Sequence, residues 1–532
     1  MRALTDCEID SLTMQNCFCE FWENISVSDE FDVSKIRSSE FFGKIFIDAN
    51  VSIVNSTVEN CMLYEGASVR NVGLLKNYIV QKNVTIHNVS RIERIYDPFN
   101  ERKNARFGEG IQVNVLDEKG SCAISLPKSN VEIPDFSMGF IEEQSVVLNT
   151  NTIENVLITQ RSVIKGATLL QNGVLEAQSY VGAGVIMKDF FLRSAKVEDN
   201  AIVERCFVEQ SQMGKGFSAT DCWIESDCEL FNGEAVSLFA GPLTVSHHKS
   251  SLLIAMRVSF FNAGSGTNQS NHMYKQGPIH FGIFDRGCKF ASGAYLPFPS
   301  RVGAFTLIMN KHANKVDVAN FPFSYLIAKE NHSLLIPAIA LGKMGTYRDE
   351  KKWQKRSSGD FDCRVLNPYV VQQILKGRSI LQSLLKEGKE SYEIGGCLIE
   401  QKSIGRAIDL YDMALAIYCS DVQTLADSTD AIWSFDYLFE EKEKEEQYKQ
   451  YVAYKLLYDQ GKISSAKDDF VDALSELTMK AKIERRSLVM KDAESEYSDI
   501  FKVCYGDTKE ERDESFARIH QFSEEEIDAL LS

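Results

Sequence analysis

Residues 145–189 read SVVLNTNTIENVLITQRSVIKGATLLQNGVLEAQSYVGAGVIMKD. Aliphatic and β-branched residues recur there in short pieces, and Asn, Gly, Ser or Asp separates these pieces every five or six residues. An amphipathic helix needs a period of about 3.6 residues, and a half-buried strand needs a sustained two-residue alternation. Neither is present. A period near six with a small residue at each corner is typical of a parallel β-helix built from hexapeptide units.

The same texture extends over residues 41–310, which we expect to form the β-helix. Three hexapeptides close a triangular coil of about eighteen residues, and Val51 to Val69 and Val163 to Val181 match that spacing. Small residues at the corners suit a tight turn and tolerate a positive φ angle. The predicted corners include residues 165–167, 182–184, 199–201, 214–216 and 232–233.

Three further segments flank or interrupt the predicted β-helix. Residues 1–40 are expected to form an N-terminal cap, and residues 91–136 an insertion that contains a β-hairpin with its turn at Asp117–Gly120. Residues 311–366 indicate a mixed segment of short strands and loops. Residues 367–532 carry apolar stripes at helical spacing, such as Val370, Ile374 and Leu381, and we expect a helical domain.

The composition and charge of the chain disfavour several classes of function. The chain has 532 residues, 25% of them charged, and a formal net charge of −17, which disfavours a general surface for nucleic acid or anionic membranes. Its apolar runs are too short to span a bilayer, and its acidic start does not resemble a signal peptide. Thirteen scattered cysteines fit a reducing compartment. We therefore predict a cytoplasmic protein without nucleic-acid or membrane partners.

The segment 241–280 is the predicted functional site, because it holds four of the eight histidines. A histidine has an unperturbed pKa near neutrality and suits general-base chemistry. The preferred catalytic candidates are His248 and His272, with His247 and His280 in reserve. Hydrogen bonding between coils is the alternative role for each of them.

Small polar and cationic residues surround these histidines. Ammonium and guanidinium groups can bind anions, and a loop rich in Gly, Ser and Asn can present polar groups to a sugar or phosphate. Arg286 and Arg301 are further cations of the same region. The predicted substrate-binding residues are Lys249, Arg257, Ser265, Thr267, Asn268, Gln269, Asn271 and Lys275. No metal ligand is assigned.

The chain resembles the left-handed β-helix, hexapeptide-repeat superfamily. Three strings, AGPLTVSHHKSSLLIA (240–255), FNAGSGTNQSNHMYKQGPIH (261–280) and ANFPFSYLIA (319–328), resemble an uncharacterised family of Bacteroides-type gut bacteria and spirochaetes. Some of its members are loosely labelled nucleotide-sugar pyrophosphorylase-like. The resemblance implies a mainly β protein: a left-handed parallel β-helix with a β-hairpin insertion and a C-terminal α-helical region.

The superfamily resemblance also implies a function. Its best-known members are acyltransferases in which a histidine acts as general base, so we expect a transferase for a sugar or nucleotide sugar, with acetyl-CoA as a possible co-substrate. Homo-oligomers, above all trimers, are usual there. Two alternatives stay open: a non-catalytic sugar or sugar-nucleotide binding protein, and a zinc-dependent lyase like the γ-class carbonic anhydrases, whose histidine-x4-histidine spacing is absent here.

Overall fold

The protein is described by a computed structural model that covers residues 1–95, 104–105, 124–125, 138–269, 282–342, 344–358, 363–366 and 368–419. Short strands dominate these residues, and most of them pair in parallel with strands one coil away. The expected fold class is confirmed: the protein is a left-handed parallel β-helix with an inserted segment and a C-terminal helical region. No helix in these ranges is long and apolar enough to cross a membrane.

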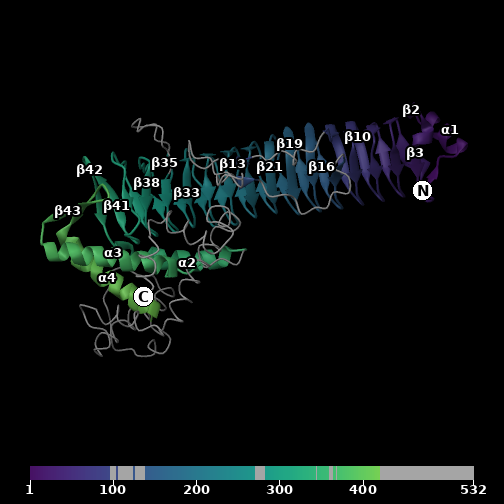
Figure 1. The fold of residues 1–532 in the computed structure, drawn as a ribbon. Coiled ribbons are helices and arrows are strands. Elements are labelled where there is room, and N and C mark those ends of the chain that lie inside the picture. The colour runs from purple at the N-terminus through teal and green to yellow at the C-terminus, as the bar shows by residue number, and fades with distance from the viewer. Residues whose placement is uncertain are drawn as a thin grey trace, which may run out of the picture. The chain divides into compact units, whose positions relative to one another are not determined.

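The described residues divide into two compact units, the first formed by residues 1–95, 104–105, 124–125 and 138–236 and the second by the described residues between 237 and 419. The described residues of the first unit contain 29 strands, most of which form successive rungs in Figure 1. They are β1 Arg2–Ala3, β2 Phe18–Cys19, β3 Ile25–Val27, β4 Ile36–Arg37, β5 Glu40–Phe42, β6 Ile45–Ile47, β7 Ser52–Val54, β8 Thr57–Glu59, β9 Met62–Leu63, β10 Ser68–Lys76, β11 Tyr78–Val80, β12 Thr85–Glu93, β13 Asn104–Ala105, β14 Ile124–Ser125, β15 Gly139–Ile141, β16 Val146–Leu148, β17 Thr152–Ile158, β18 Val163–Lys165, β19 Leu169–Glu176, β20 Tyr180–Val181, β21 Ile186–Arg193, β22 Lys196–Val197, β23 Ile202–Glu204, β24 Phe207–Glu209, β25 Gln212–Met213, β26 Ser218–Thr220, β27 Trp223–Ile224, β28 Glu229–Leu230 and β29 Glu234–Val236.

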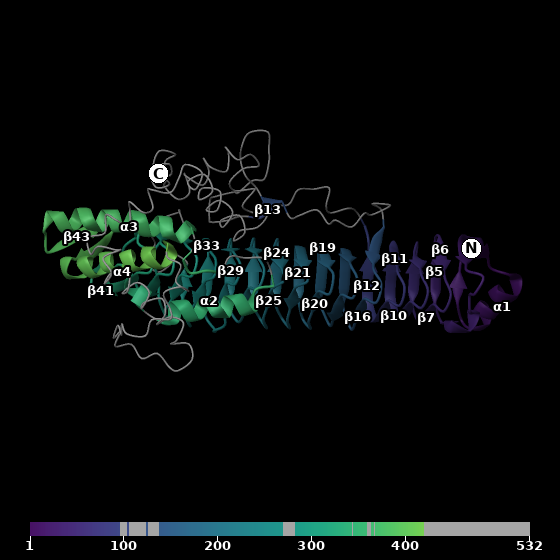
Figure 2. The same cartoon turned by 90° about the horizontal axis from the view of Figure 1, so that it is seen from below.

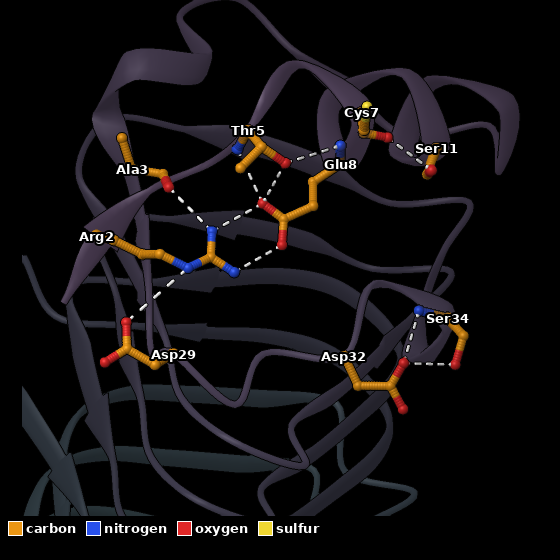
Figure 3. Close-up of polar contacts among 9 residues, drawn as sticks. All are labelled: Arg2, Ala3, Thr5, Cys7, Glu8, Ser11, Asp29, Asp32 and Ser34. Carbon is orange, nitrogen blue, oxygen red and sulfur yellow. Dashed lines mark hydrogen bonds and ion pairs between the residues drawn. The ribbon is translucent and has the colours of Figure 1, made fainter.

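A short helix, α1 (Asp6–Met14), precedes the coils. Thr5 caps it: its hydroxyl accepts from the backbone N–H of Glu8, and the Glu8 carboxylate accepts from the backbone N–H of Thr5. Arg2 donates to both oxygens of the same carboxylate, at 2.7 and 2.8 Å (Figure 3). The hydrogen bonds from Arg2, followed by those from Thr5, lower the pKa of Glu8 to about 2. Parallel pairing begins directly after α1, where β2 pairs with β5.

One inward-facing column of side chains illustrates the core of the first unit. Register pairs connect its members from coil to coil, and each is fully buried. Burying one such aliphatic side chain contributes about 1.5–3 kcal/mol. The column consists of Ile53, Val69, Ile86, Val147, Ile164 and Val181.

The corners adopt the left-handed backbone region that the sequence predicted. Gly166, Gly184, Asn200, Gly216 and Asn232 all have φ between 56° and 80°. Glycine has no Cβ to clash there, and asparagine tolerates the conformation better than other side chains.

Asparagines at one corner also hydrogen-bond to one another along the stack. Side-chain amides join Asn55 to Asn71, Asn71 to Asn88 and Asn88 to Asn149, at 3.1, 2.9 and 3.0 Å. The ladder satisfies polar groups that a left-handed corner leaves outside the strand hydrogen bonds. Asparagine is therefore both a turn residue and a contact between coils.

Many coils are shorter than the eighteen residues expected, although others, such as that from Lys289 to Leu307, match this length. Ile53 pairs with Val69, sixteen residues later, and Val163 pairs with Tyr180 rather than with Val181. At many corners a single residue with positive φ is enough to change the direction of the chain. One side of the triangular coil then often contains five residues instead of six. The sequence spacing therefore identified the repeat but misjudged its register.

The insertion lies mostly outside the described residues. Its two described pieces, β13 and β14, pair antiparallel through Asn104 with Ser125 and Ala105 with Ile124. This agrees with the expected hairpin, although the predicted turn at Asp117–Gly120 lies outside the described residues.

The second unit contains further coils, which lead into helices. Figure 2 shows two of these helices, α3 and α4, side by side. The elements are β30 Phe239–Ala240, β31 Val245–Ser246, β32 Leu252–Ile254, β33 Met256–Val258, β34 Asn262–Ala263, β35 Asn268–Gln269, β36 Gly282–Phe284, β37 Lys289–Phe290, β38 Ser300–Val302, β39 Leu307–Met309, β40 Asp317–Val318, β41 Tyr325–Lys329, β42 His332–Ile336, α2 Met344–Arg356, α3 Pro368–Glu387, β43 Ser391–Ile394, β44 Cys397–Glu400 and α4 Gln401–Cys419.

Helix α2 occupies a charged stretch where strands and loops were expected. Its indole side chain, Trp353, is 6% exposed and packs edge-on against the ring of Phe260, with the centroids 4.9 Å apart. Most helical stability comes from tertiary packing rather than from propensity, and a single aromatic anchor gives no periodic signal in the sequence.

An ion pair between Arg378 and Asp412 joins α3 to α4, and both side chains are almost completely buried. The hydroxyl of Tyr411 donates to the carbonyl of Pro322 at 2.8 Å, which ties α4 to the last coils of the second unit. The expected helices from residue 420 onward lie outside the described residues.

Candidate functional site

Two turns of the predicted site stack on one another in the second unit. Val245 pairs with Asn262 before the turns, and Leu252 pairs with Asn268 after them. The turns 247–251 and 264–267 therefore occupy the same corner of neighbouring coils. We call these two turns the histidine corner. The following coil continues it, because the N–H of Gly293 donates to the carbonyl of Ser265 at 2.7 Å.

The histidine corner exposes the side chains of His247, His248 and Lys249 on one turn and that of Ser265 on the next. Local bonds hold the first turn: the buried Ser251 hydroxyl donates to the carbonyl of His248 at 3.4 Å. Imidazoles, an ammonium and a hydroxyl thus lie on adjacent coils. Such a set can accept a proton and attract an anion.

Two of the predicted ligand contacts are buried in this arrangement. Gln269 is fully buried; its amide donates to the carbonyl of Ala294 at 3.2 Å and accepts from the N–H of Leu296 at 3.3 Å. Thr267 is also fully buried, whereas its neighbour Asn268 is partly exposed. Their assignment as substrate contacts stays a prediction, but Gln269 at least supports the stacking of coils.

Arg257 lies on a different side of the coil from Lys249. It belongs to β33, not to the histidine corner, and is 8% exposed. Its guanidinium lies 3.5 Å from the carboxylate of Asp285, which also accepts from the side chain of Gln373 at 2.6 Å. Gln373 in turn accepts from the N–H of Ala304 at 3.0 Å. Arg257 therefore participates in the packing of α3 on the coils.

The two further arginines also take part in packing. Arg286 is fully buried, with its guanidinium 4.4 Å from the ring centre of Phe260. Arg301 lies 3.9 Å from the carboxylate of Asp317, two coils along the register from Arg257. The sequence placed these cations near one another but did not show which side chains they contact.

Asn271, His272, Lys275 and His280 lie outside the described residues, between the end of β35 and the start of β36. Their roles stay predictions. In the ranges that the structure describes, no cluster of three His, Cys, Asp or Glu side chains could hold a metal ion.

Sequence reasoning missed the polar contacts that α2 and α3 make with the coils. Asp349 of α2 forms an ion pair with Lys289, and Gln373 of α3 bonds to Asp285. The only signal for Gln373 is a polar residue within an apolar stripe, between Val371 and Ile374. Its partner is 88 residues away and could not be read from local spacing.

One relative is similar to much of this chain. An uncharacterised protein of Treponema pallidum (strain Nichols) is 23% identical over 462 residues, which cover 72% of this chain and 62% of that protein. The chain thus spans less than two thirds of that relative.

Two solved structures are also similar: the UDP-N-acetylglucosamine O-acyltransferase of Moraxella catarrhalis and the UDP-N-acetylglucosamine acyltransferase of Arabidopsis. The first is 7% identical with a TM-score of 0.14 and covers 47% of this chain and 83% of its own. The second is 8% identical with a TM-score of 0.18 and covers 70% and 85%. Such low scores carry no argument about activity.

A family match is more extensive. The family described as a domain of unknown function, DUF4954, matches residues 1–131 and 125–385, which is well over half of the chain. The protein belongs to this family.

Proposed function

We propose that the protein is a transferase that acts on a sugar or a nucleotide sugar at the histidine corner. One observation carries the proposal: His247, His248 and Lys249 are exposed on a turn stacked directly on the turn that bears Ser265. A possible base, a cation and a hydroxyl group therefore lie on neighbouring coils of the stack.

Acyl transfer from acetyl-CoA is the first reaction to test. Neutral His248 would accept the proton of an acceptor hydroxyl or amine as that group attacks the thioester carbonyl carbon. The tetrahedral intermediate would then collapse by breaking the C–S bond. The thiolate of CoA would leave and take up the proton from the imidazolium, so protons and electrons balance.

Lys249 supplies the charge for binding. Its exposed ammonium, adjacent to His248, can attract a phosphate of a nucleotide sugar or of CoA. Ser265 and Asn268 can hydrogen-bond to sugar hydroxyls. Asn271, His272, Lys275 and His280 follow in the same stretch, and we propose that they complete the site, His272 as the second candidate base.

A binding protein without catalysis is the second candidate. The side chain of His248 is exposed to solvent, whereas a catalytic base normally depends on a neighbouring group that orients it. An exposed imidazole suits a binding surface equally well. Zinc ligation by the histidines and assembly as a trimer remain further proposals, and both can be measured on the same sample.

The test combines native mass spectrometry, zinc analysis and calorimetric titration of the purified protein with acetyl-CoA and with nucleotide sugars. Acyl transfer is then measured for wild type, His248→Gln and His247→Gln. His332→Gln is the control, because His332 is exposed on β42, away from the histidine corner.

A transferase should lose about 10²–10⁴-fold in turnover in His248→Gln and retain donor binding. Binding of a nucleotide sugar without transfer to any acceptor would favour the second candidate. Stoichiometric zinc with no binding of either ligand class would reject both.

A further inference from the structure

The first unit contains a hollow of about 620 Å³ that is independent of the histidine corner. It lies along one edge of the first coils, and its lining includes Glu23, Lys44, Phe46, Asn60, Met62 and Asn77. Ligand sites in proteins commonly have volumes of about 300–1,000 Å³, so its size suits a small molecule.

The register shows that the hollow is elongated along the stack. Phe46 pairs with Met62, and Met62 pairs with Ile79 of the next coil. The corner residues follow the same order, since the N–H of Lys44 donates to the side-chain oxygen of Asn60 at 3.0 Å. Neighbouring strands lie about 4.8 Å apart, so the lining from residue 24 to residue 77 extends over roughly 14 Å.

One wall of the hollow is apolar although it faces outward. Ile45 and Ile47 point into the core, so the side chain of Phe46 between them points out of the coil, although only 9% of it is exposed. The ring of Phe46 meets that of Tyr64 edge-on, with centroids 5.7 Å apart. Met62 extends this wall by one coil, and its flexible thioether can adapt to an apolar chain.

The other wall carries a negatively charged and a positively charged side chain, both at the same end of the hollow. Glu23 and Lys44 are both exposed, and neither forms an ion pair with any residue that the structure describes. Asn60 and Asn77 follow on the next two coils. The oxygen of Asn60 is bound to Lys44, and the amide of Asn77 donates to the carbonyl of Arg94 at 2.8 Å. Within the described ranges, the NH₂ of Asn60 and the oxygen of Asn77 have no further hydrogen bond, so both can bond to a ligand.

We propose that this hollow binds a small zwitterionic amphiphile, with an ammonium and an anionic oxygen in one head group on an apolar chain. The ammonium would face Glu23, the anionic oxygen would face Lys44, and the chain would lie on Phe46 and Met62. A head of a single charge would meet repulsion from one of the two residues. The chemistry fits a single-chain lipid with a zwitterionic head and, as a second source, a free apolar amino acid.

The test measures calorimetric binding to the full chain of decyl compounds below their micellar concentrations. The chain is kept constant, and the head is phosphocholine, trimethylammonium or sulfate; L-leucine forms a fourth arm. We expect decylphosphocholine to bind at least tenfold more tightly than either singly charged compound. Comparable binding of leucine would assign the second source.

If the assignment is correct, two variants should shift the preference for the head group in opposite directions. Glu23→Gln should favour the sulfate head, and Lys44→Gln should favour the trimethylammonium head. Lys35→Gln is the matched control, because Lys35 is bonded to Asn50 on a different corner. Equal binding of all three heads, or unchanged preferences in both variants, would overturn the proposal. Circular dichroism verifies that the variants fold.

Discussion

The buried histidine His312 gives the second unit a pH-dependent stability. It is fully buried between the coils and the hairpin of β41 and β42. Its Nε2–H donates to the carbonyl of Met309 at 3.0 Å, and its Nδ1 accepts from the hydroxyl of Ser333 at 2.8 Å. The neutral ring satisfies both partners, whereas a charged ring would donate to the Ser333 hydroxyl and leave its charge buried. Burial above all lowers the pKa of His312 to about 4.

The sign of the effect follows from proton binding. An unfolded chain has a histidine pKa of 6.5, so between pH 6.5 and 4 the unfolded state binds a proton that the folded state does not. The stabilisation is complete above pH 6.5 and is lost as the pH falls. At about 1.4 kcal/mol for each unit of pKa difference, the loss reaches about 2 kcal/mol at pH 5 and about 3 kcal/mol at pH 4.

The assay is urea unfolding of wild type and His312→Gln between pH 7.5 and 4, with His332→Gln as an exposed control. The variant should be less stable at pH 7.5 but should lack this part of the pH dependence. The difference in the free energy of unfolding between the two proteins should therefore shrink by about 3 kcal/mol at pH 4. His87, whose pKa is also lowered by burial, contributes equally to both. Parallel pH curves for wild type and His312→Gln would refute the reasoning.

Three further changes test the packing. Phe207→Ala removes a fully buried ring that is tilted by 32° against that of Trp223, with the centroids 4.1 Å apart; it should lower the free energy of unfolding by about 3–5 kcal/mol in urea, and a loss below 1 kcal/mol would contradict burial. Asp412→Leu should cost about 3–5 kcal/mol because it leaves the charge of Arg378 buried, whereas adding Arg378→Met should restore most of the loss; thermal melting of single and double variants decides this. Asn71→Ala, at φ 54° in the amide ladder, should cost about 1 kcal/mol, while Asn71→Gly, which keeps the permitted backbone, should cost less.

Local patterns were sufficient for the coils of this protein. Short aliphatic pieces and Gly or Asn corners are set by neighbours within about six residues, and the structure confirms corners such as Gly166 and Asn200. Coil length was not predictable to the residue, because one left-handed residue can turn a corner that two residues turn elsewhere. The register of Val163 was therefore off by one.

The candidate site was predicted only in part for a related reason. The sequence identified the stretch that bears His248 and Lys249, since clustering is visible along a chain. It could not separate Lys249 from Arg257, because a difference of eight residues places them on different sides of one coil. Nor could it assign Gln269 to a bond between coils.

The sequence by itself determined the repeat, its corners and the position of the cluster of histidines, because each depends on short-range spacing. The tertiary structure decided which polar groups are covered. Gln373 and Trp353 reach the coils from helices about ninety residues further along the chain and contact Asp285 and Phe260, which are buried. Such burial depends on where distant segments pack, which local periodicity does not encode.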